Sequence, residues 1–311
     1  MDVIRARVLG FCMGVRRAVE MAEAELAAGS GPGEASPVFS LGPLIHNPQT
    51  LAALKAQGLV ILDEDQAAAA PGKNPVVIIR AHGVSPPLEE NIRRRGARIV
   101  DATCPKVRAS QKTALTLAKR GFTVFIAGEK THAEVKGIAG YVEAGSPPDQ
   151  EKAPGGSCII AGTAAEAEAA ARTLRRERPG AKTALIAQTT LSEDEYGRIA
   201  AAIKESFPDL EIRDTICGAT RERQDALKEL CAACDAVVIA GGKESANTGR
   251  LLAIARRCGK PAWLAETAAD LPPELDRYKT LGISAGASTP DDVIEDIFTV
   301  LCRSGVSPIQ A

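Results

Sequence analysis

The 311-residue chain lacks the sequence features of several large protein classes. No apolar stretch reaches the roughly 18 residues of a membrane-spanning helix, and the N-terminal segment MDVIRARVLG has no long apolar core of the signal-peptide type. Charge is balanced, with Lys+Arg 38 against Asp+Glu 39, so no overall basic field favours nucleic acid or an anionic membrane. We therefore expect a cytoplasmic protein that binds neither of these partners and holds any anion through local groups.

Nucleotide-binding motifs are also missing, because neither G-x-x-x-x-G-K-[ST] nor G-x-G-x-x-G occurs. No bound nucleotide is expected. The sequence does contain eight cysteines. Disulfides are not expected in a cytoplasmic protein, so metal binding or catalysis is the functional interpretation of an exposed cysteine, whereas a buried one packs as a small apolar residue.

Three of the cysteines follow one repeated pattern of a strand, a cysteine and an amphipathic helix. Strand-like segments at 3–9, 97–102 and 210–216 lead to Cys12, Cys104 and Cys217 respectively. Pro105 fits the first helical position, where its missing N–H costs nothing. The N-terminus of a helix stabilises a thiolate or an anionic cluster bound to it.

Strand-like and helical segments alternate along the whole chain, which predicts an α/β fold with mainly parallel sheets. The spacing of the three cysteines predicts three similar small domains in a pseudo-threefold arrangement around a central cluster site. We predict domains at 1–103, 104–216 and 217–302 and a tail at 303–311. Each cysteine is expected at the carboxyl end of its domain's first strand, since ligands of open α/β sheets bind at that edge.

Polar residues follow other predicted strands. All three histidines of the chain lie at such positions, where an imidazole can hold a phosphate group or relay a proton: they are His46, His82 and His132. Hydroxyl and amide donors lie in similar turns, which present backbone N–H groups to an anion: they are Thr189, Thr190, Ser245, Asn247, Ser288 and Thr289.

Three convergent thiolates suit an iron-sulfur cluster whose fourth iron is open to substrate. Zinc with three protein ligands and an open position is the alternative, but zinc supplies no electrons. The remaining cysteines are predicted to be structural: Cys158, Cys231, Cys234, Cys258 and Cys302. Cys231 and Cys234 have the C-x-x-C spacing of redox or metal sites, yet they fall in an amphipathic helix, which favours packing.

Nine motifs, in order from residue 10 to residue 290, resemble the IspH/LytB family of 4-hydroxy-3-methylbut-2-enyl diphosphate reductases. They are G10-F-C-M-G-V15, L44-I-H-N47, A81-H-G-V84, A102-T-C-P105, H132-A-E-V135, Q188-T-T-L-S192, T215-I-C-G-A-T220 with Arg223 and Gln224, S245-A-N247 and G286-A-S-T-P290.

The resemblance implies one 4Fe-4S cluster on Cys12, Cys104 and Cys217, with the fourth iron open to the allylic hydroxyl of the substrate. It implies reductive dehydroxylation by two electrons and two protons to isopentenyl and dimethylallyl diphosphates, the last step of the non-mevalonate pathway. An external low-potential electron donor of ferredoxin or flavodoxin type is implied. Glu134 corresponds to the proton donor, with Thr189, Gln188 and His132 nearby.

The resemblance also assigns the substrate-binding positions. They correspond to His46, His82, His132, Gln188, Thr189, Thr190, Ser245, Ala246, Asn247 and Ser288. Ala246 stands where the family commonly has serine, which removes one hydroxyl donor worth roughly 0.5–1.5 kcal/mol but keeps the backbone N–H. Arg80, Ala133 and Glu244 also depart from the common pattern, and Glu244 would repel a diphosphate if it pointed inward.

Two other functions compete with this interpretation. A three-cysteine iron-sulfur enzyme of the quinolinate-synthase type would also take one cysteine from each domain, but it does not account for the H-x-E and Q-T-T elements. A non-catalytic redox or metal sensor would keep the cysteines and would need neither Glu134 nor an electron source.

Overall fold

The computed structural model describes residues 1–29, 36–63, 66, 74–147 and 157–303. The chain forms two compact units. Unit 1 contains Met1–Arg16, Ile45–Ala53 and the chain from Gly218 onward, and unit 2 contains Arg17–Leu44 and Leu54–Cys217. In the part of the chain that the structure describes, no helix is both long and apolar enough to cross a membrane.

Unit 2 contains two parallel four-stranded sheets. The first has the order β3-β2-β4-β5 and is built from β2 (Val38–Leu41), β3 (Val60–Leu62), β4 (Val76–Ile79) and β5 (Arg98–Asp101). Its inner strands are short apolar runs buried along their length, as expected for parallel strands covered on both faces. The helices joined to these strands are α1 (Met13–Gly29), α2 (Pro48–Ala56) and α4 (Pro86–Arg94).

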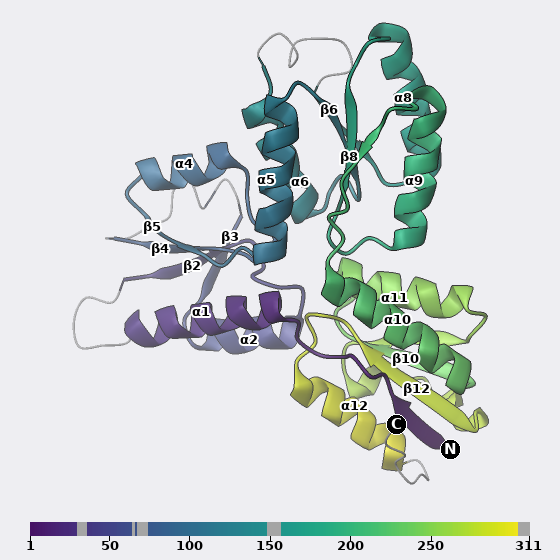
Figure 1. Ribbon diagram of the computed structural model, residues 1–311. Helices are drawn as coiled ribbons and strands as arrows, with labels where there is room; N and C mark the ends of the chain where they lie inside the picture. Colours follow the sequence, from purple (N-terminus) through teal and green to yellow (C-terminus); the bar gives the residue numbers. More distant parts are fainter. Residues whose placement is uncertain (30–35, 64–65, 67–73, 148–156, 304–311) are drawn as a thin grey trace. The chain divides into compact units, whose positions relative to one another are not determined.

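The second sheet of unit 2 has the order β7-β6-β8-β9. Its strands are β6 (Thr123–Ala127), β7 (Cys158–Ala161), β8 (Thr183–Ala187) and β9 (Glu211–Ile212). Figure 1 shows α5 (Pro105–Lys119) and α6 (Ala133–Gly145) on one face of this sheet, and α8 (Ala164–Glu177) and α9 (Glu193–Ser206) on the other. A separate apolar core fills each interface.

Unit 1 contains one parallel sheet of order β1-β12-β10-β11. Its strands are β1 (Asp2–Arg5), β10 (Ala236–Ala240), β11 (Ala262–Ala265) and β12 (Thr280–Ala285). Helices α10 (Gly218–Ala233) and α11 (Ala246–Arg257) cover one face, and α12 (Asp291–Arg303) covers the other (Figure 1). Two short 3-10 helices, η1 (Ala268–Asp270) and η2 (Pro273–Arg277), lie between β11 and β12.

The sheets correct the predicted position of the cysteines in the fold. The strands that lead to the cysteines are β1, β5 and β9, and each is an edge strand of its sheet. β5 and β9 are the last strands of their sheets in chain order, so Cys104 and Cys217 do not follow a first strand. β1 does not pair with the strands of 1–103, because it pairs in parallel with β12 and buries Val3 in that core. The local strand pattern would be the same in either sheet, so only long-range pairing decides which sheet β1 joins.

With this correction the three sheets have one topology. The first strand lies beside the second and the third, and the fourth adds at the edge next to the third. In unit 1 the fourth position is filled by β1 from the opposite end of the chain. The division into three domains stays a prediction. The predicted tail begins at Arg303, which is still part of α12, and 304–311 lie outside the described residues.

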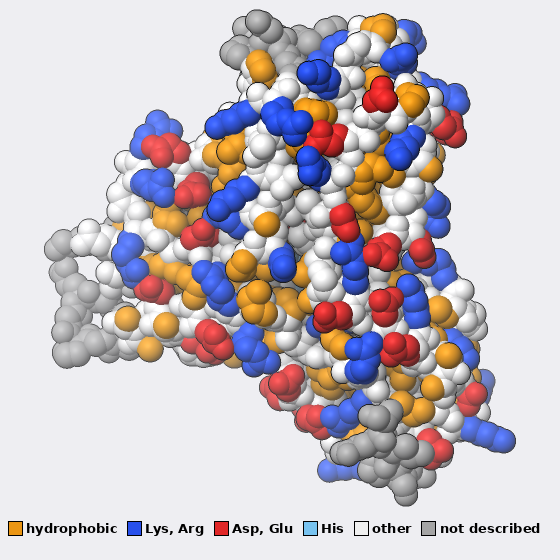
Figure 2. Space-filling view, viewed as in Figure 1, with side chains coloured by type: hydrophobic (Ala, Val, Ile, Leu, Met, Phe, Trp, Pro, Cys, Tyr) orange, Lys and Arg blue, Asp and Glu red, His pale blue; other side chains and the backbone are white. Residues whose placement is uncertain are grey.

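Surface charge agrees with the balanced composition. On the face seen in Figure 2, basic and acidic side chains are interspersed over both units. No extended surface of one sign is visible on that face among the described residues. On this face, anion binding therefore has to depend on local donors.

Candidate active site

Each of the three cysteine turns is fixed by the same backbone hydrogen bond. The cysteine N–H donates to a carbonyl just beyond the end of the neighbouring strand. The pairs are Cys12 with Ala287 (3.1 Å), Cys104 with Ala81 (2.9 Å) and Cys217 with Thr189 (2.9 Å). Ala287 and Ala81 directly precede Ser288 and His82 in the sequence, and Thr189 is itself a predicted site residue. These hydrogen bonds thus set each cysteine beside a turn that carries a predicted substrate ligand.

Two of these turns share a further structural feature, an aspartate three residues before the cysteine. Asp101 Oδ1 accepts the Thr103 N–H at 3.0 Å, and Asp214 Oδ1 accepts the Ile216 N–H at 3.1 Å. Such a bond closes a short turn without secondary structure. The D-x-x-C pattern is visible in the sequence, but the sequence analysis did not use it.

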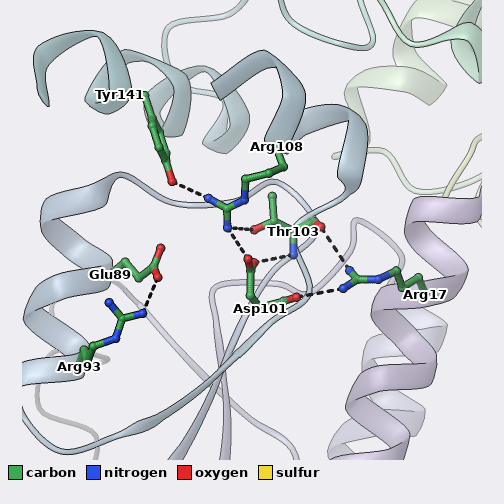
Figure 3. Close-up of polar contacts among 7 residues, drawn as sticks. All are labelled: Arg17, Glu89, Arg93, Asp101, Thr103, Arg108 and Tyr141. Carbon is green, nitrogen blue, oxygen red and sulfur yellow. Dashed lines mark hydrogen bonds and ion pairs between the residues drawn. The ribbon is translucent and has the colours of Figure 1, made fainter. Parts of the chain in front are cut away.

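Arginine side chains hold the turn before Cys104 (Figure 3). Arg17 donates to the carbonyls of Thr103 and Asp101, each at 3.3 Å. Arg108 forms an ion pair with Asp101 and donates to the Tyr141 hydroxyl at 2.5 Å. Arginine suits this role because its planar group offers several donors in a fixed geometry.

The same contacts act on the ionisation of Asp101. Partial burial by itself raises the pKa of this carboxyl, but hydrogen bonds from Thr103 and the charge of Arg108 outweigh it. The net pKa lies below the ordinary value of 3.8, so Asp101 is charged at neutral pH.

Glu134 is a buried carboxylate in the first turn of α6, with 1% of its surface exposed. Thr189 donates to both of its oxygens, from the backbone N–H to Oε1 at 2.6 Å and from the hydroxyl to Oε2 at 2.8 Å. The Thr189 carbonyl accepts the N–H of Cys217. One threonine therefore contacts the predicted proton donor and the turn of a predicted cluster ligand.

His132 is the N-cap of α6, and its Nδ1 accepts the Glu134 N–H at 3.2 Å. A ring nitrogen that accepts a hydrogen bond carries no proton, so the neutral ring keeps its proton on Nε2. The His82 ring meets the His132 ring edge to face, with centroids 5.3 Å apart. This geometry favours a neutral His132 that donates a hydrogen bond through Nε2.

Gln188 is fully buried, and both ends of its side-chain amide form hydrogen bonds with other residues of the chain. Oε1 accepts the Glu129 N–H at 3.1 Å, and Nε2 donates to Thr190 Oγ1 at 3.1 Å. These bonds hold the turn after β6 against the turn after β8. They point to a positioning role for Gln188 and Thr190.

In unit 1 the N-terminus of α11 carries a second group of predicted site residues. Ser245 is the N-cap, and its Oγ accepts the Thr248 N–H at 3.3 Å. Asn247 is 6% exposed, and its buried Nδ2 has no hydrogen-bond partner among the described residues. A buried amide donor at a helix N-terminus fits an anionic ligand. Glu244 is exposed.

The His46 and Ser288 turns pack beside this helix end in unit 1. Ser288 Oγ donates to the His46 carbonyl at 3.1 Å. A Cβ on Gly242 would lie 2.6 Å from the same carbonyl oxygen, so the backbone segments at Gly242 and His46 approach each other as closely as glycine permits. His46, Ser245, Ala246, Asn247 and Ser288 are thus brought together by unit 1 itself.

Arg223 is a buried arginine to which the sequence analysis gave no role. It is 2% exposed and donates to the carbonyls of Ala285 at 3.3 Å and Gly10 at 3.0 Å. These bonds tie the turn that contains Cys12 to the end of β12. The sequence signal that could have identified Arg223 was a charged residue at a core-facing position of α10, because a buried charge must be paired.

The chain is similar to known proteins over nearly its full length. The family model described as LytB protein matches residues 3–302. A protein of Treponema pallidum called 4-hydroxy-3-methylbut-2-enyl diphosphate reductase is 43% identical over 331 residues, covering 99% of this chain and 85% of the relative.

Two solved structures are similar to this chain. The Plasmodium falciparum E-1-hydroxy-2-methyl-but-2-enyl-4-diphosphate reductase aligns with a TM-score of 0.86 at 24% identity, covering 100% of this chain and 92% of that one, and supports the fold alone. A structure of (E)-4-hydroxy-3-methyl-but-2-enyl diphosphate reductase, the terminal enzyme of the non-mevalonate pathway, aligns with a TM-score of 0.67 at 35% identity, covering 97% and 99%. The chain belongs to the LytB protein family.

Proposed function

We propose that the protein is an oxidoreductase that converts 4-hydroxy-3-methylbut-2-enyl diphosphate to isopentenyl and dimethylallyl diphosphates, the terminal step of the non-mevalonate pathway. The names of its relatives support the substrate and the reaction. The structural observation that carries the proposal is the position of Thr189 between Glu134 and the Cys217 turn. It places a buried acid beside the turn of a proposed cluster ligand. Reductive removal of a hydroxyl needs both a proton, which the acid can supply, and electrons, which the cluster can supply. The family match favours this function over a quinolinate-synthase-type enzyme or a sensor.

The proposed cofactor is one 4Fe-4S cluster held by Cys12, Cys104 and Cys217, with one iron open to substrate. The donor set fits, since each cysteine is a half-buried thiol that precedes a long helix, and helix N-termini stabilise negative charge. When bound, such a cluster supplies electrons and a Lewis-acidic iron for the allylic oxygen. Zinc fits less well, because the reaction consumes two electrons.

Glu134 and Thr189 are proposed to deliver the proton that the departing hydroxyl needs. The backbone N–H of Thr189 can only donate, so it fixes Oε1 as an acceptor. The second contact joins Oε2 to a hydroxyl that can donate or accept. The carboxyl can therefore carry a proton on Oε2 without moving, and Thr189 can pass it along. Burial keeps water from competing for this position.

The diphosphate is proposed to bind through hydrogen-bond donors that the family resemblance assigns. They include the side-chain amide of Asn247 and the backbone N–H groups at the start of α11. Ser288, His82 and the Nε2–H of His132 are proposed as further donors. Glu244 is exposed, so its charge is not buried beside Ser245 and Asn247. Electrons are proposed to come from an external low-potential donor of ferredoxin or flavodoxin type.

The test is anaerobic purification, cluster reconstitution and iron quantitation, followed by an assay with a chemically reduced viologen as electron donor. We expect consumption of the hydroxylated allylic diphosphate and formation of both isoprenoid diphosphates. Serine substitution at Cys12, Cys104 or Cys217 should lower iron content and abolish turnover. Cys302→Ser, the matched control near the end of α12, should keep both. Full iron content in all three ligand variants would rule out the proposed ligand set.

A further inference from the structure

Helices α10 and α11 pack along two apolar stripes that both end in cysteine. The α10 stripe contributes Leu227, Leu230 and Cys231, and the α11 stripe contributes Leu251 and Ile254 to the same buried cluster. Both follow the helical spacing of three and four residues. Cys258, the C-cap of α11, continues the direction of this stripe, because it follows Ile254 by one helical turn.

The two stripes bring one buried and one exposed thiol to the same end of the helix pair. Cys231 is 2% exposed and Cys258 is exposed. Cys258 is the neighbouring thiol with the largest effect on Cys231, whose pKa it raises. Solvent therefore reaches Cys258, while Cys231 lies in the core.

The backbone around Cys258 is fixed where it meets α10. The Cys258 N–H donates to the Ile254 carbonyl at 3.0 Å, and Gly259 ends the helix in the left-handed region at φ +75°. Lys260 then donates through Nζ to the Cys234 carbonyl at 2.7 Å. This contact ties the end of α11 to the end of α10, so the two cysteines need no large backbone movement to approach.

Cys234 forms the C-x-x-C pair with Cys231 in sequence and belongs to the same buried cluster. Its sulfur lies where a Cβ on Gly282 would come within 2.9 Å, beside β12. Cys234 is itself buried, so an oxidant in solution does not reach it. Cys258 is therefore the exposed partner for Cys231.

We propose that Cys231 and Cys258 are a modification site that forms a reversible disulfide with a low-molecular-weight disulfide as oxidant. The Cys258 thiolate attacks the oxidant, forming a mixed disulfide and releasing the first small thiolate. The Cys231 sulfur then attacks Cys258, and its proton leaves with the second small thiol. Two protein thiols are oxidised, and one small disulfide is reduced to two thiols.

The order of these steps follows from the environment of each sulfur. Burial, followed by the neighbouring thiols Cys258 and Cys234, raises the pKa of Cys231 to about 12, so attack begins at exposed Cys258. The pair also lies far along α10 from Gly218, its first residue, since a helix of 16 residues spans ~24 Å. The modification does not depend on the proposed function, because it uses none of the proposed cluster or substrate ligands.

The experiment treats the anaerobic, cluster-loaded protein with oxidised glutathione, quenches it in acid, blocks free thiols with N-ethylmaleimide and maps peptides without reduction. We expect a Cys231–Cys258 cross-linked peptide and unchanged iron content. Cys258→Ser should abolish this peptide, and the matched control Cys234→Ser should retain it. Cys231→Ala should instead accumulate glutathione on Cys258.

Three outcomes would overturn the proposal. One is glutathione that stays on Cys258 in the unsubstituted protein. Another is a Cys231–Cys234 peptide as the main product. The third is a Cys258 that remains fully alkylated by N-ethylmaleimide after treatment. Because Cys258 is exposed, its serine variant tests the pair without creating a cavity in the core.

Discussion

Thr189 donates two hydrogen bonds to the buried carboxylate of Glu134, one from its backbone and one from its hydroxyl. This relationship joins the turn after β8 to the start of α6 within unit 2. It holds an acid with 1% exposure in one orientation, beside a threonine whose carbonyl fixes the Cys217 turn. Fixed orientation is what a proton donor needs at the moment of bond cleavage.

Glu134→Gln should abolish proton delivery and leave the cluster in place. We expect the turnover number to fall about 10²- to 10⁴-fold, because glutamine keeps the shape but cannot donate an acidic proton. Iron content and visible absorbance should not change. Glu143→Gln, at an exposed position of the same helix, is the control and should keep full activity. Normal turnover in Glu134→Gln would remove this residue from the mechanism.

Thr189→Val should weaken proton transfer without removing the acid. The backbone N–H to Oε1 remains, and only the hydroxyl contact is lost. A hydrogen bond to a charged group is worth about 1.5–3 kcal/mol, so kcat should fall about 10- to 100-fold with little change in KM. Thr189→Ser restores the hydroxyl and should recover most of the rate. Equal rates for the valine and serine variants would show that the hydroxyl is not used.

Asp101→Asn should reduce stability at neutral pH but not at acid pH. Because the folded-state pKa of Asp101 is lowered, its contribution is present above the ordinary value of 3.8 and is lost as pH falls below it. The side chain is 43% exposed, so solvent screening limits the neutral-pH difference to about 1 kcal/mol or less. Urea denaturation of both iron-free proteins at neutral pH and at about pH 3 measures the difference. A difference that grows toward acid pH would contradict the assigned ion pair.

Two glycines of unit 1 should respond to alanine in opposite directions. A Cβ on Gly282 would lie 2.8 Å from Leu230 Cγ and 2.9 Å from Cys234 Sγ, so Gly282→Ala should destabilise by about 1–3 kcal/mol through overpacking. Gly249 lies at an exposed position of α11 with open space around its Cα, so Gly249→Ala should stabilise by about 0.5–1 kcal/mol. Urea midpoints of the two variants provide the measurement. A loss of stability in both would mean that helix propensity does not govern Gly249.

The sequence by itself determined the α/β class and the position of each of the three cysteines between a strand and a helix. Apolar runs such as Val76–Ile79 and amphipathic segments such as Pro105–Lys119 depend on nearest neighbours along the chain, so their periodicity is readable locally. The same holds for Cys104 before Pro105, and for the predicted structural cysteines Cys158 at the start of β7 and Cys258 at the end of α11.

Only the tertiary structure decided which elements meet. The pairing of β1 with β12 joins the two ends of the chain, and no local pattern distinguishes it from a strand of the first sheet. The burial of Arg223 against the Gly10 carbonyl and the double contact of Thr189 with Glu134 also depend on residues distant in sequence. Hydrogen bonds are short and directional, so their partners are fixed by the folded positions of atoms and not by residue type.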